Sequence, residues 1–162
     1  MSKTIVVGIS DLNIAQKGDI LVTYALGSCV GICLYDPVAK IAGLSHIMLP
    51  TISDFANSNA VREKFADAAI EILVQKMLNI GAMKVRIRAK IAGGAQMFSN
   101  LNNLSLAGIG ERNVVAVKQE LLRLKIPVVA EDTGKDYGRT VFFDSNEGIM
   151  RVKSVNKGEW SF

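Results

Sequence analysis

Two segments of the chain carry the apolar spacing of a helix. Apolar residues recur at helical intervals from Phe65 to Ile80, and Gly81 is a suitable helix end. A second helix is expected from near Gly110, and Pro127 prevents its continuation. The inward face of this second helix would carry Val114, Val117, Leu121 and Leu124. Candidate caps for the first helix are Asn57, Ser58 and Asn59.

Shorter apolar runs between these helices and around them predict strands. They cover Ile5–Ile9, Ile20–Tyr24, Cys29–Tyr35, Ile41–Met48, Val128–Ala130, Thr140–Phe143 and Ile149–Val152. A further strand is predicted over Val85–Ile91, because apolar residues there alternate with Lys84, Arg86, Arg88 and Lys90. Its basic outer face could steer an acidic partner, or it could be a solvated face that discourages edge pairing. We expect one α/β domain over residues 1–162, with helices layered on sheets.

Composition narrows the class of protein further. The chain has 162 residues, of which 49% are hydrophobic and 21% charged, as in soluble globular domains. A net charge of +4 and a basic strand without aromatic residues do not indicate a nucleic-acid partner. We find no targeting signal and no apolar stretch of the ~18 residues that span a bilayer, so we expect no membrane insertion and a cytoplasmic location.

The two cysteines and the only histidine lie close together in the sequence. Asp36-Pro37-Val38-Ala39 is typical of a type I turn, and a hairpin centred there pairs residues whose numbers add up to 75. Cys29 would then face His46, close enough for a thiol–imidazole couple. The alternative is a buried cysteine and an incidental histidine on the same hairpin. Cys33 would face Ala42 as a small core residue, roughly 13 Å from Cys29, so both thiols should be free.

Neighbouring residues extend this candidate site. The glycine turn at Gly27 and Ser28 precedes Cys29 and could supply backbone N–H donors to an oxyanion. Thr23 could orient the imidazole as the third member of a triad, or it could be an ordinary strand residue. Glu131 and Asp132 are alternative orienting carboxylates, remote in the sequence.

These residues belong to a series of short sequence motifs, here called blocks, that follow one another along the chain. The blocks are TYALGSC at 23–29, SHIMLP at 45–50, KFADAA at 64–69, AKIAGGAQMF at 89–98, GIGERN at 108–113 and EDTG at 131–134. The series closely resembles the chemoreceptor glutamine deamidases, the CheD family of bacterial chemotaxis proteins, over nearly the whole chain. Lys135 departs from the family pattern, because a second glycine is common after Thr133-Gly134. Such a change can alter the loop, since only glycine adopts a positive φ at little cost.

The resemblance implies a fold, a reaction and a site. The fold would be a three-layer α/β sandwich of mixed β-sheet with two main helices, a CheD-like cysteine hydrolase fold. The enzyme would be a protein-glutamine glutaminase that converts receptor glutamines to glutamate and ammonia through a thioester. A glutamyl methylesterase side activity is compatible with that intermediate. Cys29, His46 and Thr23 would form the triad, and no cofactor or metal would be needed.

The resemblance also implies partners. They would be the cytoplasmic helices of methyl-accepting chemotaxis receptors and a CheC-type chemotaxis phosphatase, contacted by a monomer through Gly93, Gly94 and Phe98. Residues 156–162 match no family block and are expected to form a variable tail. Two other classes remain open: a non-catalytic chemotaxis adaptor that binds these partners, and a thiol redox protein, although the chain lacks the C-x-x-C spacing.

Overall fold

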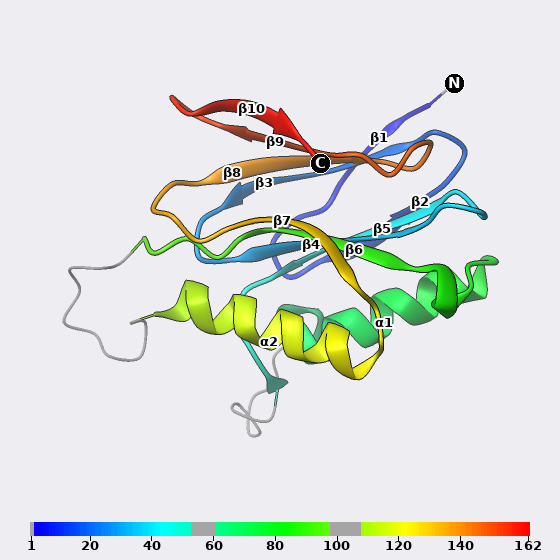
Figure 1. The fold of residues 1–162 in the computed structure, drawn as a ribbon, viewed down its shortest axis with the longest axis horizontal. Coiled ribbons are helices and arrows are strands. Elements are labelled where there is room, and N and C mark those ends of the chain that lie inside the picture. Colours follow the sequence, from blue (N-terminus) through cyan, green and yellow to red (C-terminus); the bar gives the residue numbers. More distant parts are fainter. Residues whose placement is uncertain (1, 53–60, 98–107) are drawn as a thin grey trace.

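The computed structural model, which describes residues 2–52, 61–97 and 108–162, has three stacked layers (Figure 1). An outer sheet has the strand order β1 (Thr4–Val6), β3 (Ile20–Leu26), β8 (Arg139–Asp144), β9 (Met150–Ser154) and β10 (Gly158–Ser161). A central sheet has the order β2 (Leu12–Ala15), β5 (Ile41–Ile47), β4 (Val30–Asp36), β6 (Arg88–Gly93) and β7 (Val128–Thr133). Helices α1 (Ala66–Asn79) and α2 (Ile109–Arg123) cover the other face of the central sheet.

The central sheet is buried on both faces, which explains its nearly continuous apolar strands. All seven residues of β5 are buried. One face packs on the helices through residues that include Val30, Ile32, Leu34, Ile47, Leu73 and Leu121. The opposite face packs on the outer sheet through residues that include Cys33, Ala42, Leu44, Leu21, Val141 and Phe143. Strand alternation therefore divides each central strand between two cores.

The predicted fold class is confirmed. Both sheets are mixed, because β1–β3 and β6–β7 pair in parallel while the remaining pairs are antiparallel. Both helices lie where the apolar spacing predicts them, whereas the proposed caps Asn57, Ser58 and Asn59 are outside the described residues. Within the described ranges, none of the helices combines the length and apolarity needed to cross a bilayer.

The strand predicted over Val85–Ile91 is confirmed only from Arg88 onward, and the prediction of a continuous basic outer face is wrong. Lys84–Arg86 forms a 3₁₀ turn, and the strand begins only at Arg88. Lys90 lies opposite Cys33 on β4, and its ammonium group donates to the carbonyls of Gly148 and Phe162 at 2.8 Å each. Burial lowers the pKa of Lys90, although nearby Cys33 and Asp144 act in the other direction. Lys90 thus holds the outer sheet against the central one instead of forming a solvated face.

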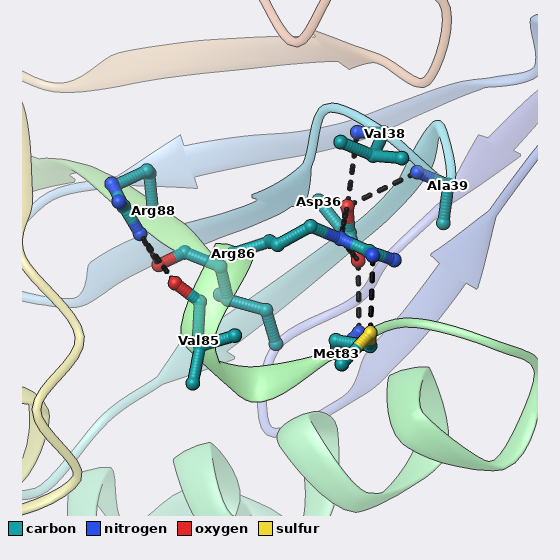
Figure 2. A network of polar contacts seen from close by, with 8 residues as sticks. Asp36, Val38, Ala39, Met83, Val85, Arg86 and Arg88 are labelled. Atoms are coloured by element: carbon teal, nitrogen blue, oxygen red, sulfur yellow. Dashed lines mark hydrogen bonds and ion pairs between the residues drawn. The ribbon is translucent and has the colours of Figure 1, made fainter.

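Arg86 belongs to a polar network that fixes the end of the β4–β5 hairpin (Figure 2). The buried Asp36 carboxylate accepts from Arg86 Nε at 2.9 Å and from the N–H groups of Met83, Val38 and Ala39 at 2.8–3.1 Å. Burial alone would raise the pKa of Asp36, but these hydrogen bonds together lower it to about 2. The hairpin turn is therefore tied to the segment that leads into β6.

Two strands escape the sequence prediction. Leu12–Ala15 pairs with β5 at one edge of the central sheet, and Gly158–Ser161 pairs with β9 at one edge of the outer sheet. The second strand lies in the predicted tail at 156–162, whose variability stays a prediction. Trp160 packs against the core between the sheets, and its Nε1 donates to Asp132 at 2.9 Å. The chain end is thus part of the outer layer.

Candidate active site

A short polar contact joins the outer and central sheets at Thr23 and His46. Thr23 lies on β3 and His46 on β5, and neither is exposed to solvent. The Thr23 hydroxyl oxygen lies 2.6 Å from His46 Nδ1 and 2.7 Å from the carbonyl oxygen of Val7. The structure therefore brings together two of the three residues proposed for the triad.

The hydrogen bonds of Thr23 determine which imidazole nitrogen carries the proton. A carbonyl oxygen can only accept, so the single hydroxyl hydrogen of Thr23 points to Val7. The contact with His46 must then run the other way, with Nδ1–H donating to the hydroxyl oxygen. In a neutral imidazole this leaves Nε2 with a free lone pair, as a general base requires.

Burial keeps this imidazole neutral. It lowers the pKa of His46 to about 4, because the interior disfavours the charged ring. His46 Nε2 is buried and has no hydrogen-bond partner among the residues that the structure describes. Since buried polar atoms are usually paired, an unpaired basic nitrogen is a functional candidate.

Gly31 on β4 leaves room for the contact between the sheets. It lies directly opposite His46 in the central sheet. A Cβ at this position would lie 3.0 Å from Leu26 Cδ1 and 3.8 Å from Thr23 Cγ2. A larger residue here would therefore push β3 away from the imidazole.

Cys29 lies in a bend at residues 27–29. Each backbone carbonyl of this bend accepts a hydrogen bond. The three carbonyls accept, in order, from the N–H of Ala95 at 2.9 Å, the side-chain amide of Asn113 at 2.9 Å and the N–H of Gly94 at 2.8 Å. Cys29 is partly buried and packs against the core between the two sheets. Three contacts from two separate segments thus fix the backbone around this thiol.

Two backbone N–H groups of the bend lack a carbonyl acceptor among the described residues. The Gly27 N–H donates to the carbonyl of Ala25 at 3.1 Å. For the N–H groups of Ser28 and Cys29 the described residues supply no carbonyl acceptor, and the Cys29 N–H lies by its own thiol. Burial raises the pKa of the Cys29 thiol, and its own N–H offsets part of that effect. The thiol is therefore protonated at rest, beside donors that suit a developing oxyanion.

Comparison with known proteins places this chain in a family. The family model described as CheD chemotactic sensory transduction matches residues 48–154. A probable chemoreceptor glutamine deamidase CheD from Caldanaerobacter subterraneus subsp. tengcongensis is 52% identical over 97% of this chain and 96% of its own length. A protein of the same name from Desulfitobacterium hafniense is 46% identical over 98% of both chains. The chain belongs to the CheD family.

One comparison with a solved structure does not contribute to the family assignment. The crystal structure of the Bacillus licheniformis hypothetical protein YfiH aligns with a TM-score of 0.45 at 16% identity, covering 78% of this chain and 51% of the other. The family model begins after His46, whereas the two CheD relatives span nearly the whole chain. The assignment of this chain to the CheD family therefore rests on sequence.

The predicted register of the CheD hairpin is wrong by two residues. Asp36 pairs with Ile41, so paired numbers add up to 77, and His46 lies opposite Gly31 instead of Cys29. Cys33 accordingly faces Leu44 and not Ala42, although its burial in the core is confirmed. A shift of two preserves strand alternation, and Cys29 packs on the face that carries His46, toward the outer sheet.

The residues proposed to contact partners have different surroundings. Gly93 is buried with a φ of +110°, and a Cβ there would lie 2.3 Å from the Cys29 carbonyl oxygen. Gly94, also buried, lines a pocket of about 310 Å³ at the N-terminus of α2, together with exposed Gln96 and Met97. Phe98 lies outside the described residues. The two glycines thus shape the Cys29 bend, and only Gly94 reaches a pocket.

Lys135 lines the same pocket and keeps the backbone shape of a glycine. Its φ is +63°, in the left-handed region, and its carbonyl accepts from the N–H of Gln96 at 2.8 Å. Lys135 therefore adopts a conformation that glycine would adopt at less cost, and the backbone strain is about 1–2 kcal/mol.

The alternative orienting carboxylates are engaged elsewhere. Glu131 pairs with Lys118 at 2.9 Å, and Asp132 accepts from Arg139 at 3.1 Å and from Trp160. Neither carboxylate contacts His46 among the described residues.

Sequence reasoning also missed Asn113, although the sequence contained a signal for it. It precedes Val117 by four residues, so it occupies an inward position on α2 that apolar residues otherwise fill.

Proposed function

We propose that this chain is a chemoreceptor glutamine deamidase in which Cys29 is the nucleophile, His46 the general base and acid, and Thr23 the residue that orients the imidazole. The observation that carries the proposal is the Thr23–His46 contact, which leaves a buried Nε2 free to take a proton. The names of the CheD relatives supply the substrate class.

The first half of the reaction forms a thioester. The Cys29 sulfur attacks the side-chain carbonyl carbon of a receptor glutamine, and the thiol proton moves to His46 Nε2. The N–H groups of Ser28 and Cys29 stabilise the resulting oxyanion, an effect typically of about 2.7–4 kcal/mol per donor. His46 then returns the proton to the amide nitrogen, the C–N bond breaks and ammonia leaves.

The second half consumes water. His46 Nε2 takes a proton from a water molecule, whose oxygen attacks the thioester carbon. The C–S bond breaks, Cys29 recovers its proton from His46, and the receptor carries a glutamate in place of the glutamine. A glutamyl methyl ester would form the same thioester with loss of methanol, so we also propose a methylesterase side activity.

The pKa shifts of Cys29 and His46 indicate how the two side chains are protonated before the reaction. A low imidazole pKa and a raised thiol pKa favour a neutral thiol and a neutral imidazole over a thiolate–imidazolium pair. The thiolate then forms only as the proton moves during attack. A thiol that is neutral at rest also reacts slowly with oxidants, because oxidation requires the thiolate.

The partners follow from the same proposal. We propose that the chain acts as a monomer in the cytoplasm, on the cytoplasmic helices of a methyl-accepting chemotaxis receptor. A CheC-type phosphatase would bind the same face. Gln96 and Met97 are exposed, and the side chain of Met97 lies against Gly27 of the Cys29 bend.

Mass spectrometry of a receptor cytoplasmic fragment tests the proposal. Each deamidated glutamine gains about one dalton, so incubation with the wild-type chain should yield defined mass shifts that Cys29→Ala and His46→Ala abolish. Cys33→Ala is the matched control, because that thiol is in the core and the variant should remain active. A fragment that binds the wild type without any mass gain would favour the adaptor function instead.

A further inference from the structure

Asn113 connects the two segments that carry the proposed nucleophile and base. It lies on α2 and has no solvent exposure. Its side-chain Nδ2 donates to the carbonyl of Ser28 and to the carbonyl of Met48, both at 2.9 Å. Ser28 immediately precedes Cys29, and Met48 follows His46 by two residues.

Stability alone does not account for an asparagine at this position. Both neighbours are carbonyl oxygens, which only accept, so the amide NH₂ must face them. The Asn113 Oδ1 is then buried without a partner among the described residues. The cost of that unpaired oxygen is of the same order as the net gain from two neutral hydrogen bonds. The advantage of the amide therefore lies in the geometry that it imposes.

That geometry concerns the peptide bond between Ser28 and Cys29. Peptide bonds are planar, and this one is trans, so its C=O and N–H point in opposite directions. Because Asn113 draws the Ser28 carbonyl toward α2, the Cys29 N–H points away from α2, to the side where its own thiol lies. Gly94 holds the next carbonyl, so the peptide cannot easily rotate back.

We propose that Asn113 is a positioning residue that aims the Cys29 N–H into the oxyanion site. This inference rests on the proposed function and adds to it a residue that acts through the backbone. The Asn113 amide does not touch the substrate. It holds the donor in the orientation that stabilises negative charge on the carbonyl oxygen of the attacked glutamine.

Two reactions of Cys29 separate this role from a structural one. Deamidation passes through an oxyanion, whereas alkylation by iodoacetamide displaces iodide from carbon and forms none. Asn113→Leu and Asn113→Ala should lower kcat for deamidation of the receptor fragment at least about tenfold with little change in KM. The rate of Cys29 alkylation should stay within about twofold of the wild type, since the thiol and imidazole are retained.

A matched variant controls for loss of stability. Val117 is buried one turn further along α2, and Val117→Ala should destabilise the fold while leaving kcat unchanged. An unchanged kcat in both Asn113 variants, or an equal loss of deamidation and alkylation, would overturn the role of Asn113. A wild-type chain that alkylates at Cys29 but never deamidates the fragment would refute the proposed function, and this inference with it.

Discussion

His46 provides the sharpest test of the active-site geometry, because it is the only histidine in the chain. Its pKa is lowered to about 4 by burial, compared with about 6.5 in an unfolded chain. A single histidine gives a single set of imidazole resonances, so NMR titration of the folded protein should report this pKa directly. The nitrogen shifts should also identify a proton on Nδ1, since that nitrogen donates to Thr23.

The lowered pKa also predicts how stability depends on pH. Above about pH 6.5 the imidazole is neutral in both states and contributes no pH dependence. As the pH falls from about 6.5 to about 4, the unfolded chain takes up a proton that the folded chain excludes, so stability decreases. The loss should reach about 2 kcal/mol near pH 5 and about 3 kcal/mol once both states are protonated.

Urea unfolding of the wild type and of His46→Gln isolates this contribution. Carboxylates titrate in both proteins, but only the wild type has the imidazole, so the wild type should lose about 2 kcal/mol more between about pH 7.5 and about pH 5. Equal losses in the two proteins, or an NMR titration midpoint near 6.5, would contradict a buried, neutral His46.

Three further perturbations test neighbouring parts of the structure. Thr23→Val removes the acceptor of the Nδ1 proton and should lower kcat for deamidation at least about tenfold. Thr23→Ser keeps the hydroxyl and should stay close to the wild type, so equal activity of the two variants would exclude the orienting role. Asp36→Asn replaces the carboxylate that accepts from four donors and should lower the free energy of unfolding by about 2–3 kcal/mol near neutral pH. In the wild type this stabilisation should persist down to about pH 4 and decline as the pH falls toward about 2, which urea unfolding over that range would measure. Gly93→Ala forces a Cβ against the Cys29 carbonyl and should reduce kcat. Gly158 has a similar positive φ but lies in open space, so Gly158→Ala should reduce only the melting temperature. The same kcat in both variants would show that the Cys29 bend tolerates displacement.

The hairpin shows how far a turn signal can determine register. Asp-Pro identified the turn, but its centre depends on which residues the Asp36 side chain caps. Asp36 is the last residue of β4, its carboxylate holds the N–H groups of Val38 and Ala39, and Lys40 closes the loop at a φ of +55°. The centre of this loop lies one residue further along the chain than the centre of a type I turn that begins at Asp36. Local propensity identified the turn, and the observed register is the one in which Asp36 caps Val38 and Ala39 and also pairs with Arg86.

The remaining errors share a physical cause. Lys90 looks exposed in the sequence because its neighbours alternate, yet its stem crosses the space between the sheets to reach carbonyls at a distance of 58 and 72 residues. The strand Gly158–Ser161 is short and polar, so only its pairing with β9 makes it a strand. Asn113 carried a sequence signal, an amide on an apolar helix face, but its partners Ser28 and Met48 depend on the packing of α2 against the central sheet. Periodicity predicts which elements form, and long-range contacts determine what their polar residues meet.

The position of the site between two sheets has a consequence for catalysis. His46 lies on β5 in the central sheet, and Thr23 reaches its Nδ1 from β3 in the outer sheet. A change that moves β3 away from β5 therefore removes the imidazole's orienting partner, and the Cys29 bend, which directly follows β3, is also held from the helix side by Asn113. A contact from the outer sheet thus orients the base, and a contact from α2 helps to fix the backbone beside the nucleophile. Thr23 variants should impair proton transfer, and Asn113 variants should impair oxyanion stabilisation. A Thr23→Val, Asn113→Leu double variant should therefore lose close to the product of the two single losses in kcat, and a smaller combined loss would indicate that both residues act through one shared rearrangement.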